Sequence, residues 1–281
     1  MDRSHTTMQP TGNARVPGTR PEGAHNEAEA AARVRQMFSR IAPRYDFLNH
    51  LLSLSFDRLW RRWTAHRFGH ILARPEARVL DLCCGTGDLT LALARGARAT
   101  VLGTDFAHPM LVLAREKLKR STGGHGFSRA VKPDNHAVAS APEGRAIEYL
   151  ESDALTLPFA DASFDLATAA FGFRNLANYE AGLREMLRVL KPGGEVGILE
   201  FSEPRGAILG PVYRFYFTRV LPRIGGVVSG SADSYEYLPS SVLAFPSAED
   251  LAGLMKQVGF TDARFEHWTG GIVALHTARR R

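Results

Sequence analysis

The sequence predicts an α/β fold built on a mostly parallel sheet of about seven strands, with one antiparallel strand and helices on both faces. Three observations predict it. Apolar runs suited to buried strands alternate five times with segments of helical periodicity, the pattern of β-α-β units. The first strand leads into a glycine turn and a helix at residues 78–88. Two further strand-like runs flank Gly270 and Gly271 and indicate a hairpin.

The chain begins with a segment that has almost no apolar periodicity. Residues 1–27 are rich in Pro, Gly, Thr, Asn and charged residues, which bury too little apolar surface to offset the entropy of ordering. We therefore expect a disordered tail there and a single domain over residues 28–281. No apolar run reaches the ~20 residues of a membrane span and no signal peptide is evident, so we expect a cytoplasmic protein.

A helical cover is expected at residues 28–72, ahead of the sheet. The apolar face of its first helix is formed by Val34, Met37, Phe38 and Ile41. Pro43 is expected to end this helix, because proline lacks an N–H and clashes with the preceding turn. A second helical region carries Trp60 and Trp63. Such aromatic residues can pack in the core, cover a ligand site or contact a membrane, and the sequence leaves these three roles open.

The remaining elements follow from apolar runs and their stop signals. The strands are expected at residues 79–82, a run ending at 105, 146–150, 164–170, 196–201, 263–268 and 272–277. The helix after the fourth strand should stop at 191–194, where Lys-Pro-Gly-Gly cannot continue it. Ser247 and Gly259 cap the last helix. Residues 120–144 predict a disordered surface insertion, and residues 203–241 an inserted cover on the substrate side.

The turn after the first strand carries a signal for ligand binding. Gly85 and Gly87 allow the backbone to turn sharply and to approach a ligand closely. Asp105 ends the second apolar run, where one carboxylate can accept hydrogen bonds from both hydroxyls of a ribose. The arrangement predicts a nucleotide site at the carboxyl ends of the strands.

The glycine pattern indicates which nucleotide is bound. A dinucleotide fingerprint requires three spaced glycines, whereas Cys83 stands in the first slot, and Asp88 would repel a pyrophosphate at the helix start. With Asp81 and Asp105 also acidic, the loop suits the sulfonium of S-adenosylmethionine better than NAD. The alternative is that the aspartates only cap the helix and solvate the loops.

Charge and cysteine content exclude other classes. The net charge is +6, but the Lys and Arg residues are spread along the chain and accompany no nucleic-acid recognition motif, so no nucleic-acid partner is expected. A basic surface fits solvation, or loose contact with an anionic membrane face. The two cysteines, Cys83 and Cys84, are adjacent, which rules out a disulfide framework and makes a metal site unexpected.

At this point the chain resembles the class I S-adenosylmethionine-dependent methyltransferases, and more narrowly the C-methyltransferases of menaquinone and ubiquinone biosynthesis. The segments that carry the resemblance are 38–49, 80–88, 157–159, 171–175, 188–194, 199–202, 221–225 and 232–238. Generic methyltransferases share the second and fifth. The Phe-Gly-Phe-Arg-Asn segment at 171–175 and the Ala-Asp-Ser-Tyr segment beginning at 232 narrow it to the quinone enzymes.

The resemblance implies a Rossmann-like methyltransferase fold and a set of cofactor contacts. The family's contacts to S-adenosylmethionine fall on Thr86, Asp105, Asp153, Ala154 and Ala170. Position 170 is Ser in some relatives, so one hydroxyl contact is missing here. Together with Asp81, Gly85 and Gly87 of the loop, these residues make up the expected cofactor site. Asp153 follows the third strand, where its carboxylate can accept from an adenine amino group.

Three further residues are candidates for catalysis. The resemblance assigns Arg174 and Asn175 a part in deprotonating the substrate. An arginine is a poor base but a strong partner for a phenolate, directly or through a water that Asn175 orients. Tyr45 either faces the substrate, closes over the cofactor or anchors the first helix, and these alternatives stay open.

The resulting hypothesis is C-methylation of a prenylated quinol by S-adenosylmethionine, with demethylmenaquinol as the acceptor. The alternatives are a 2-methoxy-6-polyprenyl-1,4-benzoquinol of ubiquinone biosynthesis, or another small molecule of a class I methyltransferase. A dinucleotide oxidoreductase, a nucleic-acid methyltransferase and a non-catalytic binding module fit the motifs less well. The sequence leaves open the prenyl length, homo-oligomerisation and peripheral contact with the inner membrane.

Overall fold

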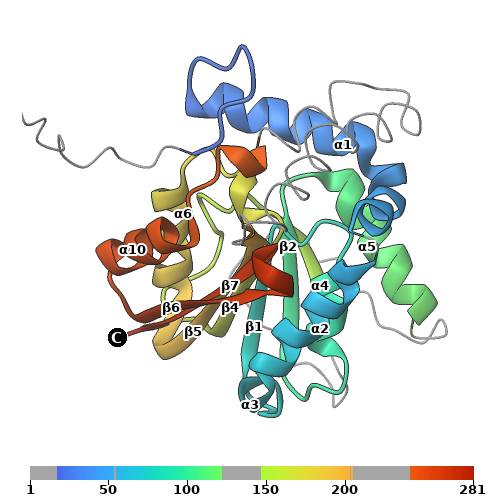
Figure 1. Cartoon of the computed structure of the whole chain (residues 1–281). Coiled ribbons are helices and arrows are strands. Elements are labelled where there is room, and N and C mark those ends of the chain that lie inside the picture. Colours follow the sequence, from blue (N-terminus) through green and yellow to red (C-terminus); the bar gives the residue numbers. More distant parts are fainter. Residues whose placement is uncertain (1–17, 54, 122–146, 203, 205–240) are drawn as a thin grey trace, which may run out of the picture.

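A seven-stranded sheet forms the centre of the fold, in the order β3-β2-β1-β4-β5-β7-β6 (Figure 1). The computed structural model describes residues 18–53, 55–121, 147–202, 204 and 241–281. Its strands are β1 (Arg78–Leu82), β2 (Thr100–Asp105), β3 (Ile147–Glu151), β4 (Phe164–Ala170), β5 (Leu190–Phe201), β6 (Phe260–Trp268) and β7 (Val273–Arg280). Neighbouring strands are parallel except that β7 runs antiparallel to both β5 and β6. The predicted sheet with one antiparallel strand is confirmed.

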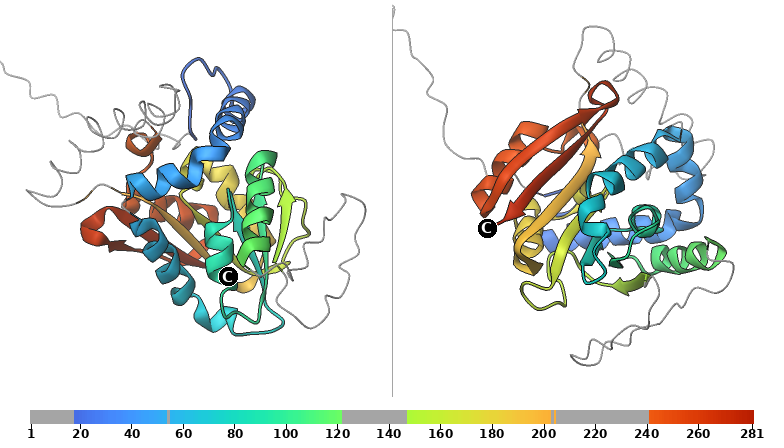
Figure 2. Two further views of the ribbon diagram at one scale, coloured as in Figure 1. Left: turned by 90° about the vertical axis from the view of Figure 1, so that its right-hand side faces the viewer. Right: turned by 90° about the horizontal axis from the view of Figure 1, so that it is seen from below.

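Helices cover both faces of the sheet, as the sequence predicts (Figure 1 and Figure 2). They are α1 (Glu27–Leu52), α2 (Phe56–Arg67), α3 (Gly69–Leu72), α4 (Asp88–Ala94), α5 (His108–Ser121), α6 (Tyr179–Val189) and α10 (Ala248–Val258), with short 3-10 turns η1 (Phe173–Asn175) and η3 (Thr269–Gly271). Helices α3 and α4 pack on one face, and α6 and α10 pack on the other. Among the described helices, none is long and apolar enough to cross a bilayer.

Strand β1 shows why the sequences of the central strands are continuous apolar runs. Val79 and Leu80 are both fully buried but point to opposite faces of the sheet. Val79 packs in a cluster with Leu89 and Leu93 of α4, and Leu80 in a cluster with Met186 of α6. Each such side chain contributes about 1.5–3 kcal/mol by burial. Helices on both faces therefore demand apolar residues at successive positions of a parallel strand.

Helix α1 runs through Pro43, so the expected end of the helix at this residue is wrong. A proline in a helix interior removes the hydrogen bond to the carbonyl four residues earlier, here that of Ser39, and costs about 3 kcal/mol. Pro43 lies on the exposed side of the helix, while its neighbour Ala42 is buried against Met110 of α5. Packing of the inner face offsets the local penalty, which a periodicity argument does not include.

Residues 18–26, expected to belong to the disordered tail, are ordered against the loop after η1. The Thr19 amide donates to the Leu176 carbonyl at 2.8 Å, and Arg20 Nη1 donates to the Ala177 carbonyl at 2.6 Å. A Cβ on Gly18 would stand 2.0 Å from the carbonyl carbon of Ala177, so the backbones touch. Backbone hydrogen bonds need no apolar periodicity, and this is why composition misplaced the boundary. Residues 1–17 lie outside the described residues.

The expected helix stop at 191–194 also differs in detail. Strand β5 begins at Leu190, directly after α6, and therefore contains the Lys-Pro-Gly-Gly segment. Gly193 takes a φ of 77°, which a glycine adopts at little cost. The pairing of β4 with β5 shifts register between Phe164 and Leu166, so the extra residues are absorbed as an irregularity at the start of the strand.

Other expected elements are confirmed or lie outside the described residues. Strands β6 and β7 form the predicted antiparallel pair, and Ser247 caps α10 by accepting from the Asp250 amide at 3.1 Å. The predicted insertion at 120–144 overlaps α5, which extends to Ser121, and its remainder is outside the described part. Most of the predicted segment 203–241 is also outside it.

A polar network, here called the Lys117 network, fastens α1 onto the turn after β1. Lys117 Nζ of α5 lies 2.7 Å from Asp46 Oδ2 of α1, 2.6 Å from Asp88 Oδ1 of α4 and 3.0 Å from Thr86 Oγ1. Thr86 Oγ1 in turn donates to Asp46 Oδ1. One ammonium therefore joins three elements around the glycine turn, and this fixes the position of α1 relative to the turn.

Lys117→Met tests this role of the network. The substitution keeps the apolar stem of the side chain but removes the charge that holds Asp46. Because these groups are partly solvated, the expected loss is about 1 kcal/mol, seen as an approximately fivefold faster amide exchange across α1. Hydrogen exchange read by mass spectrometry on peptides of residues 27–52 measures it.

The matched control is Arg120→Met on the same helix. Within the described residues, Arg120 pairs with Glu116, one turn earlier, and both side chains are mostly exposed. We expect no change in the exchange of α1 in this variant. Unchanged α1 exchange in Lys117→Met would show that apolar packing alone holds the helix.

Candidate active site

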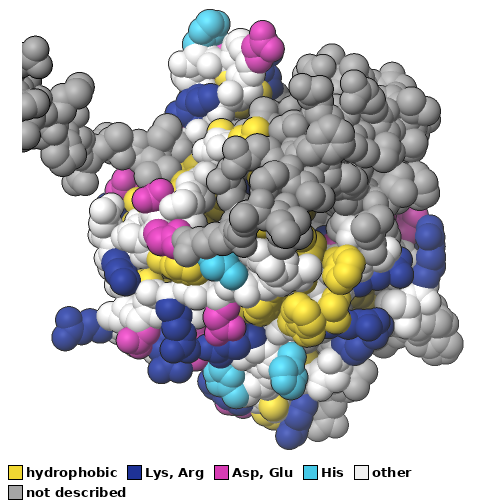
Figure 3. All heavy atoms as spheres, in the orientation of Figure 1, with side chains coloured by type: hydrophobic (Ala, Val, Ile, Leu, Met, Phe, Trp, Pro, Cys, Tyr) yellow, Lys and Arg dark blue, Asp and Glu magenta, His cyan; other side chains and the backbone are white. Residues whose placement is uncertain are grey.

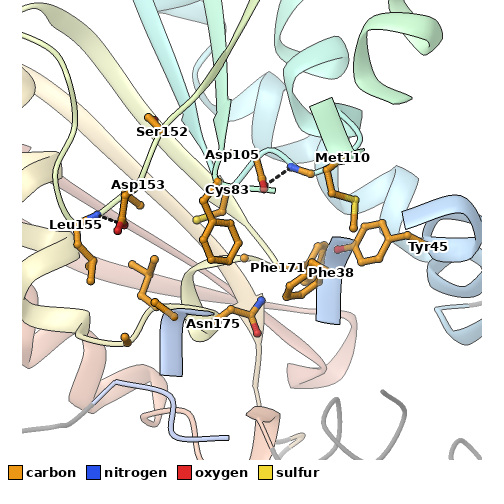
Figure 4. A pocket seen from close by; sticks show the side chains of 17 residues that line it. Phe38, Tyr45, Cys83, Asp105, Met110, Ser152, Asp153, Leu155, Phe171 and Asn175 are labelled. Atoms are coloured by element: carbon orange, nitrogen blue, oxygen red, sulfur yellow. Dashed lines mark hydrogen bonds between the residues drawn. The ribbon is translucent and has the colours of Figure 1, made fainter. Parts of the chain in front are cut away.

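A pocket opens at the edge of the sheet where the parallel strands end. Its space of about 650 Å³, partly continuous with solvent, is within the range of small-molecule sites. Helix α1 forms one wall and the loops after β1, β2, β3 and β4 form the others (Figure 4). The lining residues include Phe38, Tyr45, Cys83, Gly85, Asp105, Met110, Asp153, Ala154, Phe171 and Asn175. The predicted position of the site is thus where the pocket lies.

Asp105 is held in place by both neighbouring loops. Its Oδ2 accepts from the Gly85 amide and its Oδ1 from the Ala107 amide, each at 2.9 Å. Burial raises the pKa of Asp105 to about 6, against the lowering effect of these bonds. A carboxylate accepts about four hydrogen bonds in total, so two backbone donors leave capacity for a diol. The geometry suits the ribose contact that the sequence predicts.

The two glycines of the turn have different roles. Gly85 lines the pocket with a φ of 55°, and a Cβ there would lie 3.7 Å from Cε1 of Tyr45. Gly87 does not line the pocket. A Cβ at this position would stand 2.3 Å from the Tyr149 hydroxyl, so packing at the start of α4 requires a glycine here, and the predicted contact of Gly87 with the cofactor stays a prediction.

Asp153 and Ala154 line the opposite end of the pocket, after β3. Asp153 Oδ1 accepts from the Leu155 amide at 2.9 Å, which orients the carboxylate within its own loop (Figure 4). Leu155 adds apolar surface beside it, while Met110 lies across the pocket, near Tyr45. A carboxylate beside apolar walls fits an aromatic base with an amino group, as the sequence predicts.

Three predicted cofactor residues lie in a second, smaller cavity behind the turn instead. Asp81, Thr86 and Ala170 line this cavity, which shares Tyr45 and Cys83 with the first pocket. They are therefore not part of the ribose and base region. Asp81, within the sheet, and Thr86, in the Lys117 network, both bond to protein side chains, and their roles toward the cofactor stay predictions.

Asp81 braces the sheet against α4. It accepts from the Thr90 hydroxyl at 2.6 Å and from the Thr168 hydroxyl at 2.9 Å, and it is 1% exposed. Burial raises the pKa of Asp81 to about 7. A motif cannot reveal these partners, because Thr90 and Thr168 come from separate elements.

The charge of Asp88 is compensated, which corrects one step of the sequence argument. Asp88 pairs with Lys117 and also lies 4.0 Å from Arg61 Nη1. A neutralised carboxylate repels a pyrophosphate much less than a lone one. What continues to disfavour a dinucleotide is therefore the glycine spacing, not Asp88.

Arg174 is buried behind the pocket wall rather than exposed in it. It is 4% exposed, and its Nη1 donates to Glu200 Oε2 at 2.9 Å and to the Phe171 carbonyl. Its backbone amide also donates to Glu200 Oε1 at 3.1 Å. Glu200 is fully buried, and sequence reasoning did not single it out, although it lies in the 199–202 segment that carried the resemblance.

Asn175 and Tyr45 do line the pocket, from opposite sides (Figure 4). Burial raises the pKa of the Tyr45 phenol, while the positive charge of Arg174 lowers it, so these two groups are within electrostatic reach of each other. The Tyr45 phenol therefore stays protonated at neutral pH and is a hydrogen-bond donor. The predicted catalytic residues are brought together, with Arg174 one layer behind the other two.

Cys83 lines both cavities. A Cβ on Gly172 would lie 2.5 Å from the Cys83 Cβ, so the ends of β1 and β4 are in close contact here. Burial raises the pKa of both cysteine thiols well above the usual value, and they stay protonated. Within the described ranges, no group of three His, Cys, Asp or Glu side chains could hold a metal ion.

Comparison with known proteins agrees with this site. The model of the ubiE/COQ5 methyltransferase family matches residues 26–280. A demethylmenaquinone methyltransferase of Thermus thermophilus is 46% identical over 87% of this chain and 100% of the relative. Another of Deinococcus radiodurans is 45% identical, over 88% and 92%. A ubiquinone/menaquinone biosynthesis C-methyltransferase UbiE of Geobacter sulfurreducens is 43% identical over 90% of each chain.

Solved structures show the same fold at low identity. A SAM-dependent methyltransferase from Aquifex aeolicus aligns with a TM-score of 0.55 and 18% identity, over 84% of this chain and 98% of that one. The [4+2]-cyclase SpnF aligns with a TM-score of 0.58 and 17% identity, over 94% and 98%. Since one fold carries both activities, it is the family match together with the pocket that identifies the chain. This chain belongs to the ubiE/COQ5 methyltransferase family and is an S-adenosylmethionine-dependent methyltransferase.

Proposed function

We propose that this enzyme transfers a methyl group to a ring carbon of a prenylated quinol, and that demethylmenaquinol is the acceptor. The observation that carries the proposal is that one pocket joins Asp105 and Asp153, suited to an adenosine, to Asn175 and Tyr45, which are suited to a phenolic ring. The first two relatives described above are named demethylmenaquinone methyltransferases, which supports the naphthoquinol.

The residues present fit S-adenosylmethionine. Asp105 accepts from the ribose hydroxyls at the lone pairs that its backbone donors leave unoccupied. Asp153 accepts from the amino group of the base. Gly85 has no side chain, so the backbone can approach the cofactor closely at the pocket wall. When bound, this cofactor supplies a methyl group on a sulfonium, an electrophile that needs neither a metal nor a covalent enzyme intermediate. The protein's task is alignment and charge stabilisation.

The acceptor ring becomes nucleophilic when one of its hydroxyls is ionised. Arg174 stabilises the resulting phenolate through its positive charge, directly or through an ordered water that Asn175 orients. Glu200 fixes the guanidinium for this role, because its carboxylate accepts from both Nη1 and the backbone amide of Arg174. Tyr45 donates from the α1 side of the pocket. Because an arginine pKa is above about 12, the proton passes to water and not to the guanidinium.

A benzoquinol of ubiquinone biosynthesis is the second candidate acceptor. It is supported by the name of the Geobacter relative, which covers both pathways. The pocket walls that meet the ring, Phe38 and Phe171, are apolar and accept either ring system.

The exposed face of α2 supports peripheral contact with an anionic bilayer. Phe56 and Trp63 are 43% and 40% exposed there, and Arg58 and Arg62 are exposed between them. Figure 3 shows hydrophobic side chains gathered over α2 next to basic ones. Aromatic residues enter the interface, and each basic residue adds about 1 kcal/mol on an anionic surface. A prenylated acceptor resides in such a bilayer.

The function is tested by incubating the protein with methyl-labelled S-adenosylmethionine and one of two reduced acceptors, demethylmenaquinol or the demethylated benzoquinol. Each is presented in phosphatidylglycerol or in phosphatidylcholine vesicles. We expect label in the naphthoquinol, with faster transfer in the anionic vesicles. Label only in the benzoquinol would replace the acceptor, label in neither would refute the quinol proposal, and equal rates in both vesicles would refute the membrane contact.

A paired substitution tests Arg174 without the complication of folding. Arg174→Ala alone leaves Glu200 buried and unpaired, which costs about 3–5 kcal/mol of stability. Arg174→Gln with Glu200→Gln keeps a neutral hydrogen-bonded pair. This double variant is expected to fold and to bind S-adenosylmethionine within about threefold of the parent, while turnover falls about 100-fold or more for loss of the charge facing the phenolate.

Calorimetric titration and single-turnover transfer separate the two effects. Glu200→Gln alone, which keeps the cation, is expected to retain most of its turnover. If the double variant transferred methyl groups at the rate of the parent, Arg174 would be only structural.

The pH dependence of cofactor binding tests Asp105. Its pKa of about 6 in the free protein means that the carboxylate is ionised above this pH and protonated below it. Ribose hydroxyls donate best to the ionised form, so affinity for S-adenosylhomocysteine should fall from pH 7 to pH 5, by at most about tenfold per pH unit below the pKa. Asp105→Asn should bind more weakly at pH 7 and lose this slope. A slope that persists in Asp105→Asn would assign it to another group.

A further inference from the structure

The smaller cavity behind the glycine turn has a composition unlike that of the cofactor pocket. Its space of about 300 Å³ is partly continuous with solvent, and it shares Tyr45 and Cys83 with that pocket, so the two cavities meet at these side chains. Where the larger pocket is mainly apolar, this one is lined by Arg61, Asp81 and Asp88. Charged side chains in a cavity that adjoins a cofactor pocket indicate that a charged end of the ligand binds there.

Arg61 is the one cationic side chain that lines this cavity among the described residues. It is 6% exposed, and two groups fix its guanidinium: Asp57, one turn earlier on α2, pairs with its Nη1, and the Phe171 ring centroid lies 5.3 Å from its central carbon. A guanidinium has five N–H donors in a planar fork, and the Asp57 pair occupies Nη1. The fork is therefore held rigidly at the cavity with donors to spare.

The acidic groups here are unequal partners for Arg61. Asp88 is neutralised mainly by Lys117, with Nζ at 2.6 Å, whereas Arg61 Nη1 is 4.0 Å away. Asp81 is bonded to two threonine hydroxyls and carries a raised pKa from burial. Neither of these two carboxylates lies within hydrogen-bond distance of Arg61, so the donors that Asp57 does not occupy can meet a carboxylate of a ligand.

We propose that this cavity receives the amino-acid end of S-adenosylmethionine and that Arg61 binds its α-carboxylate. With the ribose at Asp105 and the base at Asp153, the amino-acid chain leads past Tyr45 and Cys83, which line both cavities. A planar guanidinium matches a carboxylate with two parallel hydrogen bonds. The inference rests on the cofactor that the family uses and is independent of the quinol.

Four ligands separate this role from a structural one. S-adenosylmethionine and S-adenosylhomocysteine carry the carboxylate, decarboxylated S-adenosylmethionine lacks only this group, and 5′-methylthioadenosine lacks the whole amino-acid end. Titration calorimetry on Arg61→Met should show the first two weakened by about 10- to 100-fold and the last two within about twofold of the parent. Arg61→Lys should restore part of the affinity for the first two.

The matched control is Arg62→Met, next in the chain but exposed, for which all four affinities should be unchanged. Since Arg61→Met removes the cation that neutralises the buried Asp57 carboxylate, the titrations are repeated with Asp57→Asn added to it. Equal weakening of all four ligands in both Arg61 variants would make Arg61 a structural residue. Unchanged binding of the first two would place the carboxylate elsewhere. Because no acceptor is present, either result leaves the quinol proposal standing.

Discussion

The whole arrangement depends on the parallel pairing of β2, β1 and β4, which brings their carboxyl ends to one edge of the sheet. Asp105 ends β2, the glycine turn follows β1, and Phe171 follows β4. The strand pairing therefore makes neighbours of residues that are far apart in the sequence, although no sequence motif links them. The bond from the Gly85 amide to Asp105 then ties two of these ends together. Both faces of the strands are buried under helices, which makes this edge rigid enough to position a cofactor.

Around this edge, buried cations are paired before any ligand arrives. Glu200 holds Arg174, Asp57 holds Arg61, and Asp46 with Asp88 holds Lys117. Pairs of this kind add little to stability when compared with apolar packing, since desolvation offsets the attraction. Their value here is orientation: each pair fixes a charge at a defined place, with Arg61 lining the smaller cavity and Arg174 and Lys117 lying behind the lining residues. The site is thus preorganised by ion pairs that differ in depth, from the buried Arg174 pair to the partly solvated Lys117 network.

The sequence was sufficient for features with local causes. The glycine turn, the carboxylate at the end of β2 and the Ser247 cap each follow from a few neighbouring residues, and the strand-helix alternation determined the sheet. It failed where tertiary contacts override local preference. Pro43 sits inside α1 because the opposite face of the helix is buried, and residues 18–26 are ordered by backbone bonds to the loop after η1. The cofactor roles of Asp81 and Thr86 stay predictions; what no spacing rule shows is that both side chains also bond to protein side chains from other elements.

The antiparallel direction of β7 has a practical consequence. Because Arg279 pairs with Glu195 near the beginning of β5, the chain finishes at the amino ends of the parallel strands, on the far side of the sheet from the pocket (Figure 1). A surface, a bead or a fused fluorescent protein attached after Arg281 would therefore leave the mouth of the pocket unobstructed. An enzyme immobilised through this end keeps the pocket edge of the sheet accessible to ligands and vesicles.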